Sequence, residues 1–185
     1  LFPGEVLGVV GESGSGKSTL AKAVLQLIRP TSGNVFFEDQ ELTQHWCKRF
    51  GQWVWNDELR DLRQHAQLIF QDAAESLNPR LNIRESVAEP LRAFGQTDET
   101  LITSRVAELL STVGLASEHS ERYPHQLSGG QSQRVVIARA LALKPKLIIA
   151  DEPLSALDAP IRTQILELMR NLRQEFGLSC VYISH

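Results

Sequence analysis

The chain reads Gly11-Glu12-Ser13-Gly14-Ser15-Gly16-Lys17-Ser18-Thr19, which fits the pattern G-x-x-x-x-G-K-[ST]. An apolar run over residues 5–10 precedes it, and good helix formers follow over residues 19–28. A glycine-rich loop between a strand and a helix can close its backbone N–H groups around phosphates, and the helix N-terminus adds a favourable dipole. We therefore predict a phosphate-binding loop, called the P-loop below (residues 11–19), rather than a chance glycine-rich turn.

Residues of the P-loop have individual roles in this pattern. Lys17 is expected to contact the β- and γ-phosphates of a nucleoside triphosphate, and the Ser18 hydroxyl is expected to bind Mg²⁺. We expect every residue of the loop to contribute to the nucleotide site. The predicted cofactors are accordingly ATP and Mg²⁺.

Two adjacent acids follow a continuous apolar run at residues 147–150. Such a run is typical of a parallel strand that is covered on both faces. Ligands of open α/β sheets bind at the carboxyl ends of the strands, so Asp151 is expected near the P-loop, where it would bind Mg²⁺ directly or through water. Glu152 would polarise the water that attacks the γ-phosphate. The alternative is that both acids are merely solvated at the end of a strand.

Strands and helices alternate along the chain, which predicts an α/β fold with a mostly parallel sheet flanked by helices. Further short strands are expected at residues 34–37, 67–70 and 180–183, and residues 42–61 are expected to be irregular. Helical periodicity extends from about residue 72 to residue 143. We predict a single domain over residues 1–185, in which residues 1–71 and 144–185 form the core and residues 72–143 form an inserted α-helical subdomain.

Apolar side chains define the buried faces of two predicted helices. Gly114 is the expected end of the first helix, while Pro160 suits the first turn of the second and Gly177 its end. The face of the first helix comprises Leu101, Ile102, Val106, Leu109, Leu110 and Val113, and that of the second comprises Ile161, Ile165, Leu168, Met169, Leu172 and Phe176.

The composition and the net charge limit the classes of protein to which the chain can belong. Hydrophobic residues make up 42% of the 185 residues, which is enough for a folded core. The net charge of −3 gives no overall basic field, so we expect no nucleic-acid partner. No apolar run approaches the length of about 20 residues that spans a bilayer. The chain begins at Leu1 rather than at a methionine, and we interpret it as a fragment of a longer protein.

Cysteines and tryptophans give weaker signals. Cys47 and Cys180 lie far apart without metal-ligand spacing, so we expect unpaired thiols and a reducing compartment. Three tryptophans, at positions 46, 53 and 55, lie close together in the sequence. They could form an exposed binding patch, but local packing is the favoured interpretation.

Further motifs reveal a resemblance to a known family. The segment Leu127-Ser128-Gly129-Gly130-Gln131, called the signature segment below, precedes the acidic strand. Together with the P-loop, Gln71, Asp151-Glu152, Ser155-Ala156-Leu157-Asp158 and His185, it resembles the nucleotide-binding domain of ABC-type ATPases. The matching motifs span nearly the whole chain. A P-loop alone occurs in many unrelated enzymes, whereas a signature segment at this place is highly specific.

The resemblance implies a role for each matching residue. Gln71 is similar to the glutamine that joins the core to the helical subdomain and reaches toward the metal and the attacking water. The residues Ser128, Gly129, Gly130 and Gln131 would contact the γ-phosphate bound to an opposite domain. Asp158 is similar to the acid of the loop that links the two sites, and it could also cap the helix that begins near Pro160. His185 is similar to the switch histidine that contacts the γ-phosphate.

The resemblance extends to a subgroup. Residues 67–80 and 123–126 look like the importer ATPases for dipeptides, oligopeptides and nickel, with departures at Ala73 and Ser132. This implies a head-to-tail homo- or heterodimer with a second ABC ATPase domain, transmembrane permease subunits, a substrate-binding protein, and a peripheral location on the cytoplasmic face of the inner membrane. The alternative is a non-transport ABC ATPase that serves a soluble complex.

Overall fold

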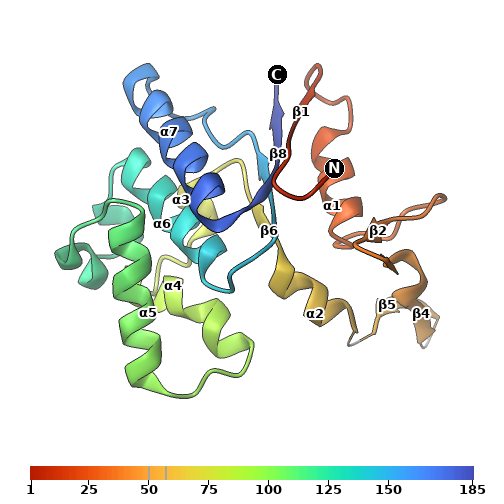
Figure 1. Cartoon of the computed structure of the whole chain (residues 1–185), viewed down its shortest axis with the longest axis horizontal. Helices are drawn as coiled ribbons and strands as arrows, with labels where there is room; N and C mark the ends of the chain where they lie inside the picture. Colours follow the sequence, from red (N-terminus) through yellow and green to blue (C-terminus); the bar gives the residue numbers. More distant parts are fainter. Residues whose placement is uncertain (50, 57) are drawn as a thin grey trace.

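The computed structural model describes residues 1–49, 51–56 and 58–185. Its central sheet contains four parallel strands in the order β1-β8-β7-β6, as Figure 1 shows. These strands are β1 (Val6–Val10), β6 (Ala66–Ile69), β7 (Leu147–Asp151) and β8 (Ser179–Ser184). Their carboxyl ends meet at one edge because all four run in the same direction. The predicted α/β fold with a parallel sheet is confirmed.

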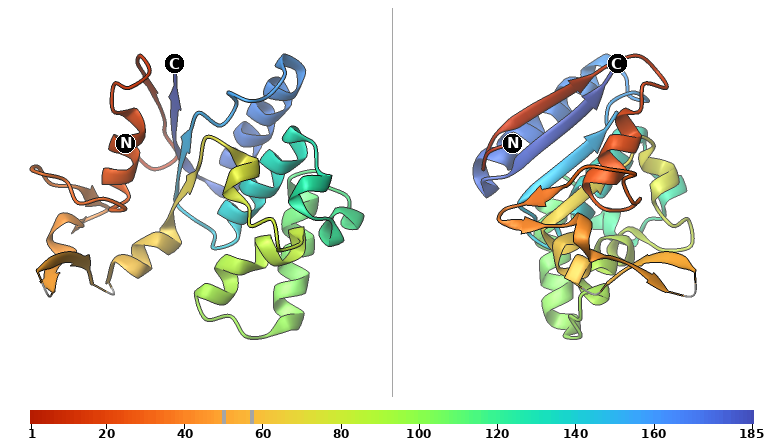
Figure 2. Two further views of the ribbon diagram at one scale, coloured as in Figure 1. Left: turned by 180° about the vertical axis from the view of Figure 1, so that it is seen from behind. Right: turned by 90° about the vertical axis from the view of Figure 1, so that its right-hand side faces the viewer.

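Helices cover both faces of the sheet (Figures 1 and 2). On one side lie α1 (Lys17–Val24) and α2 (Glu58–His65). On the other lie α3 (Ala73–Ser76), α4 (Ile83–Ala93), α5 (Glu99–Thr112), α6 (Gly129–Leu141) and α7 (Ala159–Phe176). The helical character of the segment between β6 and β7 is as predicted. Its division from the core at residues 71/72 and 143/144 stays a prediction, since one apolar cluster joins α4, α5 and α6 to β7.

Strand β7 is buried along its whole length. Ile148 and Ala150 belong to the apolar cluster on the side of α4–α7, whereas Leu147 and Ile149 belong to the cluster on the side of α1 and α2. Successive side chains of a strand point to opposite faces, so a strand covered on both sides must be apolar at every position. This explains the continuous apolar run seen in the sequence.

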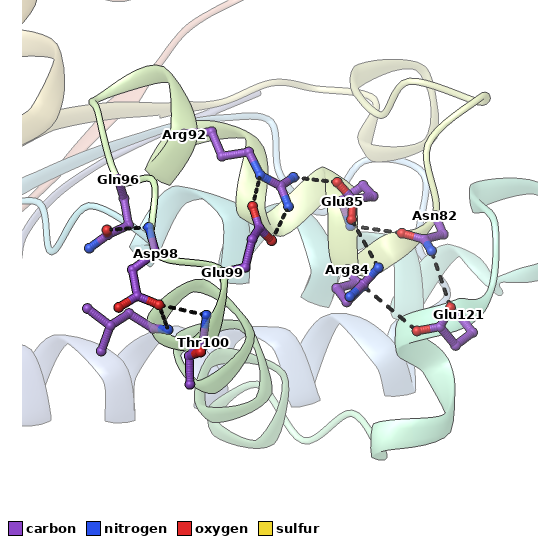
Figure 3. Close-up of polar contacts among 10 residues, drawn as sticks. Asn82, Arg84, Glu85, Arg92, Gln96, Asp98, Glu99, Thr100 and Glu121 are labelled. Atoms are coloured by element: carbon purple, nitrogen blue, oxygen red, sulfur yellow. Dashed lines mark hydrogen bonds and ion pairs between the residues drawn. The ribbon is translucent and has the colours of Figure 1, made fainter.

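The start of the helical region is fixed by caps and one arginine (Figure 3). Asn82 caps α4 by accepting from the Glu85 backbone N–H at 2.8 Å, and a corresponding aspartate caps α5. The Arg92 guanidinium links the carboxylates of Glu85 and Glu99 and so fastens the end of α4 to the start of α5. The hydrogen bond from Arg92 lowers the pKa of the Glu99 carboxyl. Its contribution to stability is small because Glu99 is exposed.

The expectation of irregular structure over residues 42–61 is wrong for the part that the structure describes; residues 50 and 57 lie outside it. Strand β2 (Phe36–Phe37) pairs with β3 (Gln40–Glu41), and β4 (Trp46–Arg49) pairs with β5 (Gln52–Trp55), both antiparallel. A 3₁₀ turn, η1 (Thr43–His45), precedes β4. The sequence did not predict helix α2, because the helix is short and largely charged. It packs against the core mainly through the buried Leu59 and Leu62.

The tryptophans are partly packed and partly exposed. The Trp46 indole N–H donates to the Gln26 side-chain oxygen at 2.7 Å, which supports local packing. Trp53 is 46% exposed, and the Arg29 guanidinium carbon lies 3.7 Å from its ring centroid. The side chain of the third tryptophan lies outside what the structure describes.

Three details of the predicted helices are corrected. Leu101 does not belong to the buried face of α5, because it is 55% exposed, and Phe176 at the end of α7 is also exposed. Helix α1 ends at Val24 rather than at residue 28, because Gln26 adopts a positive φ of 53°. The Gln26 amide is fully buried and bonds both Ala23 and the hairpin, which stabilises this early end.

Several expectations hold. Gly177 ends α7 in the left-handed region with φ of 64°, where glycine is favoured, and a proline lies in the first turn of that helix. Cys47 is exposed and Cys180 buried, and neither forms a disulfide. Burial raises the pKa of the Cys180 thiol, which keeps it protonated. Every helix in the described residues falls short of the length and apolarity of a bilayer-spanning segment.

The position of Ile148 yields a stability prediction. This side chain is fully buried at the centre of the sheet, so Ile148→Ala should lower the free energy of unfolding by about 2–5 kcal/mol through lost burial and a residual cavity. Urea-induced unfolding measures the change. The matched control is Leu166→Ala, which truncates a side chain that is 47% exposed and should cost about 0.5 kcal/mol or less. Equal losses for the two variants would contradict the assigned core.

Candidate functional site

The P-loop joins the end of β1 to the start of α1. Gly14 and Gly16 have φ values of 79° and 94°, a region that side chains with a Cβ rarely adopt. Gly16 is the N-cap of α1 and makes no side-chain capping bond, and no acid lies in the first turn. The first backbone N–H groups of α1 therefore lack a side-chain acceptor and suit an anion. The sequence places these glycines where the loop must turn sharply.

Lys17 lies under the loop that precedes it. Its side chain is 8% exposed, and its Nζ donates to the backbone carbonyls of Gly11 at 2.8 Å and Glu12 at 2.9 Å. An ammonium group has three N–H donors, so these two bonds leave one for a further acceptor. The lysine thus supplies a fixed positive charge at the base of the P-loop.

A pocket of about 260 Å³ opens beside Lys17. Residues from four separate parts of the chain line it, namely Ser13, Gly14, Gly16, Lys17, Ser18, Thr19, Gln71, Glu152 and His185. The structure therefore brings the predicted catalytic residues together around the P-loop. The other residues of the loop, Gly11, Glu12 and Ser15, support its turn through backbone contacts.

Glu152 points into this pocket from the end of β7. Its backbone N–H donates to the Ile183 carbonyl of β8 at 3.0 Å, and its φ is 47°, a strained value for a residue with a Cβ. Its carboxylate Oε2 lies 2.8 Å from His185 Nε2. Glu152 is 9% exposed and His185 is 56% exposed, so the acid is sheltered while its partner faces solvent. A sheltered carboxylate beside an imidazole can accept and pass on a proton.

Asp151 faces a neighbouring hollow that it shares with Ser18 and Gln71. It is 6% exposed, and its Oδ1 has no hydrogen-bond partner among the described residues. A buried carboxylate oxygen without a partner is costly, and a cation would relieve that cost. Hydroxyl, amide and carboxylate oxygens are the ligand types that Mg²⁺ accepts, so the three residues fit this ion.

The described residues contain no cluster of three or more His, Cys, Asp or Glu side chains that could hold a metal by themselves. This agrees with the chemistry of Mg²⁺, which keeps several waters and is usually bound by one or two carboxylates together with substrate phosphates.

The signature segment forms the start of α6. The Ser128 hydroxyl accepts from the Gln131 backbone N–H at 3.3 Å, and the Gln131 side-chain oxygen accepts from the Ser128 N–H at 2.9 Å. This reciprocal capping box satisfies two N–H groups and leaves those of the intervening glycines. A Cβ at Gly130 would lie 2.7 Å from Ile161 Cγ2, so glycine is required there for α6 to approach α7.

The signature segment lies apart from the P-loop of the same chain. Residues 128–131 line neither of the two hollows beside Lys17 and Asp151. In Figures 1 and 2, α6 and the loop between β1 and α1 lie on opposite sides of β8. One chain therefore presents two separate glycine-rich helix N-termini.

Asp158 lines neither hollow, although the nearby Ser155 and Ala156 line the one beside Asp151. It is exposed and occupies the N-cap position of α7, as expected, but its side chain makes no capping hydrogen bond. The predicted capping bond is therefore not formed. Arg162, in the first turn of α7, instead donates from its side chain to the Leu157 carbonyl at 2.6 Å and so stabilises the turn before the helix.

Two contacts of this region were missed in the sequence. One is the close approach of Gly130 and Ile161. The other joins Gln131 Nε2 to His119 Nε2 at 3.1 Å. Both pairs are well separated along the chain, and no local pattern signals them.

Comparison with known proteins assigns the family. Residues 1–155 match the family model described as "ABC transporter". The chain is 50% identical over 186 residues to the glutathione import ATP-binding protein GsiA of Escherichia coli O6:H1, and 49% identical over 185 residues to that of Pectobacterium atrosepticum. Each match covers all of this chain and 28% of the relative, so the chain spans less than a third of the relatives' length.

Comparison with solved structures supports the same family. A dimeric post-hydrolysis state of the ATP-binding cassette MJ0796 bound to ADP and Pi superposes with a TM-score of 0.84 at 34% identity, covering all of this chain and 76% of that chain. The protein cbiO1 from Clostridium perfringens, part of the ABC transporter complex cbiONQ, gives a TM-score of 0.83 at 27% identity, with coverage of 100% and 68%. From the family match, these structures and the P-loop geometry, we conclude that the chain belongs to the ABC transporter family.

Proposed function

We propose that this chain binds and hydrolyses ATP to drive import of a peptide-like or nickel-like substrate across a membrane. The observation that carries the proposal is the single pocket that joins the P-loop, Gln71, Glu152 and His185. The identity to glutathione import proteins favours a small peptide as the substrate class. The chain would act on the cytoplasmic face of the membrane, bound peripherally.

The residues of the pocket supply each part of the reaction. The P-loop N–H groups and Lys17 would bind the phosphates of ATP and stabilise the negative charge that develops on the transferred group. Glu152 would orient the attacking water and accept its proton. His185, which faces the same pocket, would contact the γ-phosphate, and Gln71 would position the water. The geometry around Lys17 and the family pattern support these roles.

Mg²⁺ would be held by Ser18 and Asp151, with Gln71 nearby. When bound, the ion would neutralise charge on the β- and γ-phosphates. Two observations support this proposal: Asp151 is buried at the end of β7, and its Oδ1 has no hydrogen-bond partner within the described part of the chain.

We infer that two ABC ATPase domains act together in a head-to-tail homo- or heterodimer. The signature segment of one domain would close over the γ-phosphate held by the P-loop of the other. The separation of these two elements within this chain supports such an arrangement, and MJ0796 is itself dimeric in its solved structure. Asp158, exposed near the start of α7, would lie close to the shared interface.

A groove of about 380 Å³ between α2, β6 and α4 suits a permease subunit. It is lined mainly by apolar side chains, including Leu27, Phe70 and Phe94, and two of these are substantially exposed: Leu27 at 40% and Phe70 at 42%. Phe70 directly precedes Gln71, so a permease segment bound here would lie next to the nucleotide pocket. A substrate-binding protein would deliver cargo on the far side of the membrane.

A non-transport ABC ATPase of a soluble complex is the second candidate. The compact helical segment between β6 and β7 agrees with either candidate. Purification with permease subunits would favour transport, and a stable soluble assembly without them would favour the alternative.

The role of Glu152 gives the first functional prediction. Glu152→Gln in the full-length protein should lower ATP hydrolysis by about 10²–10⁴-fold, because the amide cannot accept a proton from water. ATP binding should persist, and the variant should accumulate as a dimer with Mg-ATP in size-exclusion chromatography. The control Glu175→Gln changes an exposed acid of α7 and should behave as the wild type. Turnover at the wild-type rate in Glu152→Gln would refute the assigned role.

The proposed Mg²⁺ site gives the second functional prediction. Asp151→Asn removes a negative charge from the Mg²⁺ site and should raise the Mg²⁺ concentration that gives half-maximal ATP hydrolysis by at least about tenfold, the equivalent of about 1.4 kcal/mol. A Mg²⁺ titration of the hydrolysis rate measures this. Asp39→Asn, in the turn between β2 and β3, is the control and should leave the titration unchanged. An unaltered Mg²⁺ dependence in Asp151→Asn would rule out this ligand.

The proposed permease-binding groove gives the third functional prediction. Leu27→Glu introduces a charge into the apolar lining and should abolish copurification of permease subunits while ATP binding is retained. Burying an unpaired carboxylate in the contact is costly, which is the physical reason for the expected loss. Leu101→Glu places the same charge on α5 outside the groove and should leave copurification intact. Retention of the permease by Leu27→Glu would exclude this groove.

A further inference from the structure

The side chain of Gln131 connects the signature segment to a histidine outside it. His119 lies in η2 (Ser117–Glu121), a 3₁₀ turn between α5 and α6. Its Nε2 lies 3.1 Å from Gln131 Nε2, and its Nδ1 lies 3.1 Å from the Ala116 carbonyl oxygen. His119 is half-buried, so this contact is sheltered from solvent on one side.

Hydrogen-bond chemistry determines which nitrogen atoms in this chain of contacts carry a proton. A backbone carbonyl only accepts, so Nδ1 of His119 carries a proton, and Nε2 of the neutral ring is then an acceptor. The Gln131 side-chain oxygen accepts from the Ser128 N–H at 2.9 Å, so the Gln131 NH₂ group must face His119. The bonds therefore run in one direction, from Ser128 through Gln131 and His119 to Ala116.

We propose that His119 is a positioning residue that holds the signature segment in its capped conformation only while its imidazole is neutral. Protonation would place an N–H on Nε2, directly opposite the NH₂ group of Gln131. Rotation of the amide would relieve this clash but would turn the NH₂ group toward the Ser128 N–H, another donor. In both orientations the Gln131 side chain keeps only one of its two bonds. When the amide turns its oxygen toward the protonated His119, the bond to the Ser128 N–H is lost and the capping box of α6 opens.

The charged groups around η2 do not compensate. Glu118 of η2 pairs with Arg122, the residue that directly follows this turn, at 3.0 Å, and Glu121 lies 3.9 Å from Arg84 of α4. The imidazole of His119 contacts the Ala116 carbonyl and the Gln131 side chain. The other ionisable groups on the elements packed against η2 are Glu85, Glu89 and Arg92 of α4, Glu99, Arg105 and Glu108 of α5, and Arg134 and Arg139 of α6. Most of these already have partners within or between their helices, as in the pairs Arg92–Glu99 and Arg105–Glu108.

The direction of the pH effect follows. Because the native contact is made only by the neutral ring, the capped conformation is stabilised at higher pH and loses that stabilisation as the pH falls. This inference rests on the proposed function, in which the signature segment closes on ATP, because an opened cap would weaken that closure.

The experiment compares the wild type with His119→Gln and His119→Ala in the full-length protein. Glutamine keeps an acceptor toward Gln131 but does not titrate, whereas alanine removes the contact. His125→Gln is the matched control, since His125 stacks on Tyr123 with ring centroids 5.9 Å apart and lies outside this hydrogen-bond chain. Hydrogen–deuterium exchange of the peptide containing residues 128–131 is measured at about pH 5.5 and about pH 8, which bracket histidine titration.

Comparison at a single pH cancels the intrinsic pH dependence of exchange. At about pH 8 the wild type and His119→Gln should exchange alike; at about pH 5.5 the wild type should exchange about fivefold faster, the size expected for loss of a helix cap. His119→Ala should exchange fast at both values, and His125→Gln should follow the wild type. Equal exchange in the wild type and His119→Gln at both values would overturn the proposal, as would a His125→Gln variant that behaves like His119→Gln.

ATP hydrolysis provides a second readout that separates this inference from the proposed function. The ratio of the wild-type rate to the His119→Gln rate should fall about fivefold between about pH 8 and about pH 5.5, for the same loss of a cap. A rate ratio independent of pH would overturn the link between the cap and turnover. Absence of hydrolysis in every variant would refute the proposed function alone, because the exchange measurement tests the role of His119 without ATP.

Discussion

Parallel pairing of β8 with both β1 and β7 is the constraint on which the site depends. The P-loop follows β1, Asp151 ends β7 and Glu152 follows it, and His185 follows β8, so backbone hydrogen bonds bring these residues to one edge of the sheet. The bond from the Glu152 N–H to the Ile183 carbonyl extends this pairing beyond the strand and sets the height of the acid above the sheet. The residues of the site are therefore positioned by main-chain pairing.

The charges at this edge are held in different surroundings. Lys17 is buried and bonded to two carbonyls, while Asp151 is buried with an oxygen that lacks a hydrogen-bond partner among the described residues. Glu152 is sheltered but touches an exposed imidazole. Buried charges are costly unless they are paired, and this arrangement leaves the cost to be relieved by a ligand that brings both negative phosphates and a cation. Preorganised charges of this kind need little rearrangement when the ligand binds.

The signature segment is a second helix N-terminus that suits an anion, at a different place in the fold from the P-loop. Its helix N-terminus and glycines suit an anion, but α6 is fixed against α7 by the close approach of Gly130 and Ile161, away from the P-loop. A chain that carries two such helix N-termini at separate places is suited to complete its site with a second domain, as we propose. The capping box and its contact with His119 then determine how well the N–H groups of that second half are aimed.

The sequence alone determined the P-loop, the acids after a doubly covered strand and the helical character of the following segment, because each depends on neighbouring residues and on a local period. It did not predict the β4–β5 hairpin, helix α2 or the end of α1 at Val24, just before Gln26, whose buried amide bonds an indole from a later strand. The contacts of Glu152 with His185 and of Gln131 with His119 likewise emerged only from the folded chain. Such contacts join residues whose separation in sequence carries no periodic signal, so only the packing of the sheet and helices could decide them.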